Sequence, residues 1–314
     1  MTTPKYTFLL PAFKGKYLDE MLRSIKAQTY TDFKVLISDD CSPEDLRSIC
    51  EPYLSDPRFT FRRNEQNMGS KSLVSHWNLL VDMCDTEYLI MASDDDVYEP
   101  QFLAEIDALT QKYPHVDLFR GRVTNINENG ETLEEDSIFP EYQDKVTFLY
   151  NKYTSRFTLC LACFVFKSET LKKEGAFIEF PLACFSDDVT TCNLLQNGIA
   201  SPYNILFRFR TSTLNLSSIN NSNTGKMKID ATINFYEWFK LYKKEIEIEK
   251  NPQKKRMYAT VISGIHGHIM WHLMSHVKYL NVFQKVKVIL WLYQSELLSK
   301  YTDKFLLALR IFKA

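Results

Sequence analysis

Three consecutive carboxylates, Asp94, Asp95 and Asp96, follow directly on the apolar run 88–92, which is typical of a buried strand. Like charges at one strand end repel one another, so a cation is their natural compensation. Ligands that are all oxygen point to Mg²⁺ or Mn²⁺. A solvated acidic loop explains the same tract equally well. The other residues of the chain must therefore decide between the two.

Two further acidic pairs occur at points where an element ends or begins. Asp39 and Asp40 follow a second apolar run, 33–37. The Asp40 carboxylate could accept a hydrogen bond from the imide N–H of a nucleobase. An ordinary turn residue is the alternative. Asp187 and Asp188 precede a helical pattern, where two adjacent carboxylates raise one another's proton affinity and could also cap that helix and stabilise its dipole.

The elements that must position these side chains alternate in the βαβ manner. Strands are expected at 6–10, 33–37, 59–62 and 88–92, with helices at 18–25, from Ser42-Pro43-Glu44 onward, at 73–84 and at 100–109. This pattern predicts an α/β fold with a mostly parallel sheet. Both Asp40 and the acidic triplet then lie at carboxyl ends of strands, the edge at which open α/β sheets bind ligands.

Further along, the sheet is expected to become mixed. Asn129-Gly130 predicts a hairpin between extended pieces, and the run 159–166 predicts another strand. A helix over 168–174 should stop at Gly175, and the polar segment 211–225 is expected to be a mobile loop. Beyond it the chain is almost free of Pro and Gly, which indicates helices. We expect two domains, 1–225 and 226–314.

Composition excludes several protein classes. The chain has 314 residues, 45% of them hydrophobic and 25% charged, as in an ordinary globular protein. Its seven cysteines are scattered and odd in number, so a disulfide framework is not expected, and Cys160–Cys163 is better explained by a buried strand than by zinc. The N-terminus has no long apolar signal segment, so we expect a cytoplasmic protein.

The charges are distributed unevenly. Residues 226–314 contain 16 Lys and Arg against 7 Asp and Glu, whereas residues 1–225 contain 22 against 32. The two parts are therefore expected to face different partners.

With these residues in view, the chain resembles the family-2 glycosyltransferases of the GT-A fold over about residues 4–217. The resemblance depends on an ordered set of segments: Leu9-Leu10-Pro11-Ala12-Phe13, Ala27-Gln28-Thr29-Tyr30, Ile37-Ser38-Asp39-Asp40-Cys41-Ser42, Asn67-Met68-Gly69, His76-Trp77-Asn78, Tyr88 to Pro100, Gly175-Ala176-Phe177, and Asp187-Asp188. No single one of these motifs is specific, but their order along the chain is.

The resemblance implies a nucleotide site. It assigns uracil recognition to Asp40, with Pro11, Ala12 and Phe13 beside the base. Asn67, Gly69 and Lys71 would lie at the diphosphate, with Arg63 nearby. A flexible segment at Arg210 would close on the phosphates, although Ser212 replaces the histidine that the family carries there.

The resemblance also implies a metal and a base. The family's D-x-D motif aligns its last carboxylate with Asp95 and its first with Ser93, which is a departure from the pattern. Asp94 is then expected to hold the ribose or support the ion, Asp95 to bind Mn²⁺ or Mg²⁺, and Asp96 to assist. Asp188, preceded by Asp187, stands where the family has its general base.

The C-terminal part carries two patterns of its own. His268, His272 and His276 recur one helical turn apart, but the aromatic and apolar surroundings favour a packed helix over a metal site. The segment 282–313 interleaves apolar residues with lysines. Such a basic amphipathic helix either lies on an anionic membrane surface or packs on the catalytic domain or in a homodimer.

Together these features predict an inverting, metal-dependent glycosyltransferase. The expected donor is a UDP-sugar, and the expected acceptor is a glycan or lipid-linked sugar of surface polysaccharide synthesis, reached by peripheral contact with the inner face of the cell membrane. Nucleic acid is not expected as a partner. The alternative is a catalytically degenerate protein that binds sugar nucleotides or acts as a membrane-associated scaffold, which Ser93 and Ser212 suggest.

Overall fold

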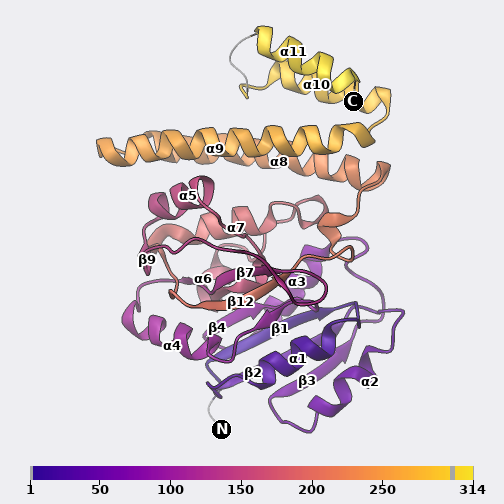
Figure 1. The fold of residues 1–314 in the computed structure, drawn as a ribbon, viewed down its shortest axis with the longest axis vertical. Helices are drawn as coiled ribbons and strands as arrows, with labels where there is room; N and C mark the ends of the chain where they lie inside the picture. The colour runs from indigo at the N-terminus through magenta and orange to yellow at the C-terminus, as the bar shows by residue number, and fades with distance from the viewer. Residues whose placement is uncertain (1–2, 298–300, 314) are drawn as a thin grey trace. The chain divides into compact units, whose positions relative to one another are not determined.

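The computed structural model describes residues 3–297 and 301–313, and the chain forms two compact units (Figure 1). Unit 1 consists of Met1–Glu179 and Ser186–Ser212, and unit 2 of Phe180–Phe185 and Thr213–Ala314. The segment 213–225, which the sequence analysis placed in the N-terminal domain, thus belongs to unit 2. The functional division into domains 1–225 and 226–314 stays a prediction.

The main sheet of unit 1 has eight strands. Their order is β3 (Phe59–Arg63), β2 (Phe33–Asp39), β1 (Tyr6–Ala12), β4 (Tyr88–Met91), β10 (Phe164–Lys167), β6 (Leu118–Arg120), β11 (Ile199–Ala200) and β9 (Tyr142–Gln143). The first four are parallel to one another, and β10 then runs antiparallel to both of its neighbours. The predicted α/β class with a mixed, mostly parallel sheet is confirmed.

Helices flank this sheet, as Figure 1 shows. They are α1 (Leu18–Lys26), α2 (Leu46–Cys50), α3 (Leu73–Met83), α4 (Phe102–Lys112), α5 (Lys145–Thr154), α6 (Ser168–Lys173) and α7 (Ser186–Leu194), with short 3₁₀ turns η1 (Glu51–Tyr53), η2 (Leu161–Cys163) and η4 (Leu195–Asn197). Apolar spacing explains the packing of α1, whose residues Leu18, Met21, Leu22 and Ile25 are fully buried.

A second sheet contains four strands in the order β5 (Val97–Tyr98), β12 (Ile205–Arg210), β7 (Arg122–Ile126) and β8 (Thr132–Glu135). Strand β5 follows the acidic triplet directly and pairs antiparallel with β12. This pairing brings Arg210, at the end of β12, beside the acidic segment although more than a hundred residues separate them in the chain.

Three local expectations were wrong. Helix α2 begins at Leu46, because the Asp45 side chain accepts from the Ser48 N–H and is the N-cap. The Ser42 hydroxyl lies in the turn before it and accepts from the Glu44 N–H at 3.1 Å. The run 159–166 is not one strand, since η2 interrupts it before β10. The segment 211–225 contains a 3₁₀ turn and the start of a helix, so it is not one irregular loop.

Unit 2 is helical in its described residues, as predicted. It contains η3 (Pro181–Ala183), η5 (Leu216–Ser218), α8 (Ser222–Glu247), α9 (Pro252–His276), η6 (Val277–Tyr279), α10 (Val282–Gln294) and α11 (Tyr301–Lys313). Helices α8 and α9 lie side by side, and α10 pairs with α11 (Figure 1). In the part of the chain that the structure describes, no helix is both long and apolar enough to cross a membrane.

Candidate functional site

The carboxyl ends of the four parallel strands form the candidate site. The register pairs Ala12 of β1 with Asp39 of β2, and Asp39 with Arg63 of β3, so these strands end at one level. Strand β4 ends nearby at Met91, since Leu9 of β1 pairs with it. The residues that follow each strand are therefore gathered at one edge, where α/β sheets bind ligands.

Asp94 joins the end of β4 to the turn after β1. Its Oδ2 accepts hydrogen bonds from the backbone N–H of Phe13 at 2.9 Å and of Lys14 at 2.8 Å. Burial raises the pKa of Asp94, and the cation of Lys14 acts against that rise. Asp94 thus fixes the turn that carries Phe13, whose ring is 39% exposed at the edge of the site.

Two carboxylates converge on one cation. The Lys14 ammonium lies 3.1 Å from Asp94 Oδ1 and 2.7 Å from Asp95 Oδ2. Burial tends to lower the pKa of Lys14, but the charges of Asp94 and Asp95 outweigh it and raise that pKa. The negative charge at this strand end is therefore offset by a lysine.

Asp96 points to other partners. It accepts a hydrogen bond from the Ser93 hydroxyl, and its Oδ1 accepts one from the Arg210 backbone N–H at 2.8 Å. Burial, followed by the charge of Asp95, raises the pKa of Asp96 to about 8. Asp96 thereby ties the acidic segment to β12, and Ser93, which departs from the family pattern, takes part in that tie.

The donor set fits a hard divalent cation. Among the described residues, no group of three or more His, Cys, Asp or Glu side chains is arranged to hold a metal. Asp94 and Asp95 nevertheless offer two carboxylate oxygens that already meet at one ammonium. Mg²⁺ is commonly held by one or two carboxylates together with substrate phosphates and water, so the two residues suffice for such an ion.

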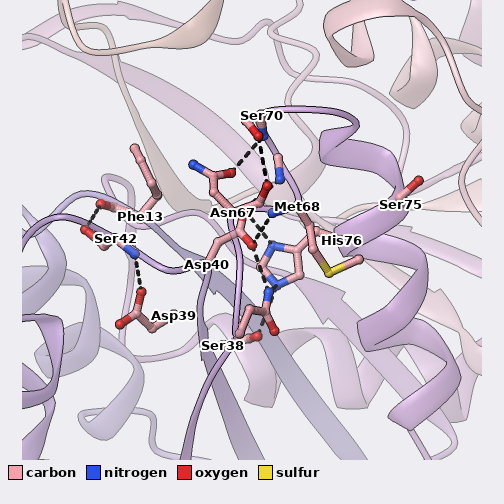
Figure 2. Close-up of polar contacts among 12 residues, drawn as sticks. Phe13, Ser38, Asp39, Asp40, Ser42, Asn67, Met68, Ser70, Ser75 and His76 are labelled. Atoms are coloured by element: carbon pink, nitrogen blue, oxygen red, sulfur yellow. Dashed lines mark hydrogen bonds and ion pairs between the residues drawn. The ribbon is translucent and has the colours of Figure 1, made fainter.

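Asp40 is held within a network of protein donors (Figure 2). Its Oδ1 accepts from Asn64 Nδ2 at 2.8 Å and from the Met68 N–H at 2.9 Å, and its Oδ2 accepts from the Gly69 N–H at 2.7 Å. His76 lies beneath it, with Nδ1 3.7 Å from Asp40 Oδ2. Burial lowers the pKa of His76, so its ring is neutral beside the carboxylate.

The loop after β3 is shaped around Asp40. A Cβ on Gly69 would lie 3.0 Å from Asp40 Oδ2, closer than nearly all real Cβ contacts, so a glycine suits this position. Asn67 stabilises the same loop, because its Oδ1 accepts from the Ser70 N–H at 2.7 Å. Lys71 is exposed just beyond it. Asn67, Gly69 and Lys71 belong to this one loop, and their roles toward a nucleotide stay predictions.

Arg210 is a buried anchor of the acidic segment. Its Nε donates to the Asp95 carbonyl at 2.8 Å, and its second guanidinium nitrogen donates to Glu20 Oε2 at 2.7 Å. The guanidinium also lies over the Tyr17 ring, 4.2 Å from the ring centre. These contacts position Asp95 and Asp96, so the structure shows Arg210 in a positioning role. Its predicted contact with phosphates stays a prediction.

Asp187 and Asp188 lie in the first turn of α7. Asp188 forms a buried ion pair with Lys152 of α5, and its backbone N–H donates to Asp187 Oδ1 at 3.0 Å. Burial tends to lower the pKa of Lys152. The neighbouring Asp188 carboxylate outweighs this effect, so the pKa of Lys152 is raised. Burial, followed by the charge of Asp188, raises the pKa of Asp187 to about 7.

Sequence reasoning missed several residues of the site. Lys14 directly follows the Phe13 turn, and this position was the available signal for it. Lys152, Glu20 and Tyr17 carried no local signal, because each meets its partner only through the fold. His76 belongs to a segment that carried the family resemblance, but its contact with Asp40 was not foreseen.

Comparison with known proteins gives a family match. The family model described as glycosyl transferase family 2 matches residues 7–175. An uncharacterized glycosyltransferase of Haemophilus influenzae is 25% identical over 290 residues, which is 90% of this chain and 91% of that protein. The poly(ribitol-phosphate) beta-N-acetylglucosaminyltransferase TarS of Staphylococcus aureus is 23% identical over 199 residues. This match covers 62% of the present chain and only 33% of the length of TarS.

Solved structures share the fold. Residues 1–349 of S. aureus TarS, crystallised with UDP-GlcNAc, match with a TM-score of 0.62 at 16% identity, covering 90% of this chain and 83% of that one. The mannosyltransferase PcManGT of Pyrobaculum calidifontis, in complex with GDP-Man and Mn²⁺, matches with a TM-score of 0.56 at 14% identity over 87% of this chain and 72% of its own.

Proposed function

The chain belongs to glycosyl transferase family 2, and we propose that it transfers a sugar from a UDP-sugar donor to a hydroxyl of a glycan or lipid-linked acceptor. Its fold is the GT-A fold that the sequence predicted. One observation carries the proposal: at the edge where β1 to β4 end, Asp94 and Asp95 converge on a single cation position. Divalent cations and nucleoside diphosphates are bound together at such sites.

The donor site uses the strand ends. The half-exposed Phe13 ring provides an apolar wall for the base, with Pro11 and Ala12 immediately before it. Asp40 is the predicted acceptor for a uracil N–H, which requires its present donors in the Met68–Gly69 loop to yield. Uridine binding is thus expected to rearrange this loop, which also contains Asn67 and Lys71.

The cation position serves the leaving group. Asp95, with Asp94 beside it, would hold Mg²⁺ or Mn²⁺. Arg210 keeps the segment in place, because its backbone N–H donates to Asp96 and its Nε donates to the Asp95 carbonyl. The bound ion would supply Lewis-acid stabilisation of the departing diphosphate. The manganese in the complex of PcManGT is consistent with this chemistry in a protein of the same fold.

The acceptor is activated by Asp188. In a single in-line displacement, its carboxylate takes the proton of the acceptor hydroxyl as the oxygen attacks the anomeric carbon. The bond from that carbon to the diphosphate breaks, UDP leaves with the bonding electrons, and the anomeric configuration inverts. Lys152 and Asp187 orient Asp188 for this role, because one pairs with its carboxylate and the other accepts its backbone N–H.

A turnover assay tests the proposal. The purified protein is incubated with UDP-sugars, Mn²⁺ and candidate acceptors, and UDP release is measured for the wild type and Asp188→Asn. We expect Asp188→Asn to retain UDP binding and to lose turnover by about a hundredfold or more, the usual contribution of a general base. Equal turnover of both proteins would instead support the alternative, a sugar-nucleotide-binding or scaffold protein.

A peripheral membrane contact through 282–313 accompanies this function. Residues 251–295 contain six Lys and Arg and no Asp or Glu. On α10, Phe283 is 82% exposed, and Val286 and Leu290 are also exposed. Apolar side chains on a helix in a stretch without acidic residues suit the surface of an anionic bilayer. The proposed contact would hold the enzyme at the inner face of the cell membrane, in reach of a lipid-linked acceptor of surface polysaccharide synthesis.

A further inference from the structure

Unit 2 contains a pocket of its own, remote in sequence from the strand ends. Its volume is about 410 Å³, within the range of ligand pockets. The lining comes from the segment before α7, from the start of α8, from the end of α9 and from η6; among its residues are Cys184, Lys228, Trp271, His272, His276 and Tyr279. Nothing in the proposed transfer reaction uses these side chains.

Close packing builds the walls of this pocket. A Cβ on Gly225 would lie 2.6 Å from Tyr279 Cβ, so the glycine allows α8 to approach η6. The His272 ring is fixed by a 2.6 Å hydrogen bond between Nδ1 and the Thr232 hydroxyl. Phe185 packs edge-on against that ring, with centroids 4.9 Å apart. The pocket is thus preformed, which lowers the entropic cost of binding a ligand.

One buried polar atom on the pocket wall lacks a partner. His276 is 9% exposed, and among the described residues its Nδ1 has no hydrogen-bond partner. Burial lowers the pKa of His276 to about 4 and that of His272 to about 3. Both rings are therefore neutral near pH 7. Buried polar atoms are normally hydrogen-bonded, so an orphaned one beside a pocket indicates a missing polar ligand or water.

The lining carries positive charge without a carboxylate. Lys228 and Lys278 both line the pocket, and no Asp or Glu is among the described residues that line it. Lys228 is 2% exposed, and its ammonium donates to the Ile219 carbonyl and to Asn220 Oδ1, each at 2.9 Å. Burial lowers the pKa of Lys228, so an anion in the pocket would stabilise its charged form.

An aromatic surface completes the pocket. Trp271 and Tyr279 both line the pocket. The Trp271 residue is 62% exposed, which is unusual for such a large aromatic side chain. Exposed aromatic rings beside a few polar groups are typical of ligand sites, since the flat apolar face supports a ring while the polar groups fix its orientation. The apolar face of a sugar ring suits such a surface.

We propose that this pocket binds an acidic sugar unit, one that carries a phosphate or a carboxylate, with its ring on Trp271 and its anionic group near Lys228 and Lys278. The identification of this acidic sugar as part of the acceptor depends on the proposed glycosyltransferase function. Binding itself does not depend on it. The pocket would give unit 2 a role in selecting acceptors by charge.

Calorimetric titration of the full chain tests the pocket. Glucose 1-phosphate, glucuronate and glucose serve as the phosphorylated, carboxylated and neutral probes. We expect both acidic sugars to bind at least about tenfold more tightly than glucose, as a charge-assisted hydrogen bond allows. The acidic sugar that binds more tightly shows whether the pocket prefers a phosphate or a carboxylate. Equal affinity for all three sugars, or no binding by either acidic sugar, would overturn the proposal.

Two variants and two matched controls locate the site. Trp271→Ala is expected to weaken the acidic sugar by about fivefold and Lys278→Gln by about tenfold. Phe283→Ala and Lys285→Gln, on α10, should leave its affinity unchanged. Unchanged affinity in Trp271→Ala and Lys278→Gln contradicts the proposed pocket. UDP binding, measured on the same samples, reports separately on unit 1. Absence of UDP binding by the wild type would count against the proposed function and not against this pocket.

Discussion

Lys14 stands where the site needs a cation. Its ammonium contacts both Asp94 and Asp95, while its backbone N–H holds Asp94 from the other side. A divalent ion that uses the same two carboxylates must displace this side chain. We then expect Lys14 to turn toward the phosphates of the proposed donor, where a second positive charge would be useful.

Replacing Lys14 therefore changes metal binding in a specific direction. Lys14→Met keeps the length and apolar stem of the side chain but removes the competing charge. We expect Mn²⁺ to bind the variant about tenfold more tightly than the wild type in the absence of nucleotide, which corresponds to about 1.4 kcal/mol. Calorimetry with Mn²⁺ alone measures this.

Lys16→Met is the matched control, because Lys16 is exposed and pairs with Glu128 instead. Its affinity for Mn²⁺ should equal that of the wild type. Weaker Mn²⁺ binding by Lys14→Met would mean that the lysine supports the ion, and would contradict the competition that the geometry indicates.

Asp187 makes stability depend on pH. Its pKa of about 7 in the folded protein lies above the value of 3.8 for an unperturbed Asp. Between these values the native state binds more protons than the unfolded state, so stability falls as pH rises through this window. We expect Asp187→Asn to show a smaller loss of Tm between pH 5 and pH 8 than the wild type does, in thermal unfolding followed by circular dichroism.

The exposed Asp82 supplies the comparison. Asp82→Asn should retain the pH slope of the wild type, since its carboxylate is solvated. An unchanged slope in Asp187→Asn would show that this carboxyl group titrates at its ordinary value in the folded protein.

Residue types alone revealed only part of this chemistry. The carboxylates were found because each follows a strand or opens a helix, which is visible in the sequence. The partners Lys14 and Lys152 were not found, because a surface lysine and a pairing lysine look the same until the fold brings a carboxylate to them. The burial of Arg210 likewise depends on β5 pairing with β12.

At the scale of elements, the first four strands and their edge could be predicted because apolar runs and turn residues mark them plainly. The start of α2 was misplaced because Ser42 belongs to a turn before the helix, where its hydroxyl donates to the Phe13 carbonyl and accepts from the Glu44 N–H, and Asp45 is the N-cap. The helical start at Ser222 was missed because Asn and Ser residues favour loops by local propensity. In the fold Asn221 instead caps this helix, since its Oδ1 accepts from the backbone N–H of Asn223 and of Thr224, each at 3.0 Å.

Helix α10 is expected to carry the membrane contact. The double change Phe283→Ser and Leu290→Ser removes two exposed apolar side chains from it. We expect binding to vesicles of phosphatidylglycerol and phosphatidylcholine to weaken by about tenfold or more, because each buried apolar side chain contributes roughly 1.5 kcal/mol or more. Co-sedimentation with the vesicles measures the bound fraction.

Ile138→Ser in unit 1 is the control, since Ile138 is equally apolar and well exposed. It should bind vesicles as the wild type does. Three results would contradict a lipid surface as the partner: binding to pure phosphatidylcholine as strong as to the anionic mixture, full binding by the double variant, or a homodimer that the double variant dissociates.

On the scale of the whole molecule, the two units divide the work. Unit 1 gathers the predicted donor residues at one sheet edge and holds Asp187 and Asp188 on α7. Unit 2 carries the sugar pocket and the exposed face of α10. The opposite charge balance of the two parts of the sequence fits this division, because an excess of lysine suits acidic glycans and anionic lipids.

The central claim is that Asp95 and its neighbours form a metal-dependent site for a nucleoside diphosphate. Titration of the purified protein with UDP, with and without Mn²⁺, tests it most directly when Asp95→Ala is measured beside the wild type. We expect the wild type to bind UDP only in the presence of Mn²⁺, and we expect the variant not to bind it. Binding that is equal in both proteins, or independent of Mn²⁺, would contradict it.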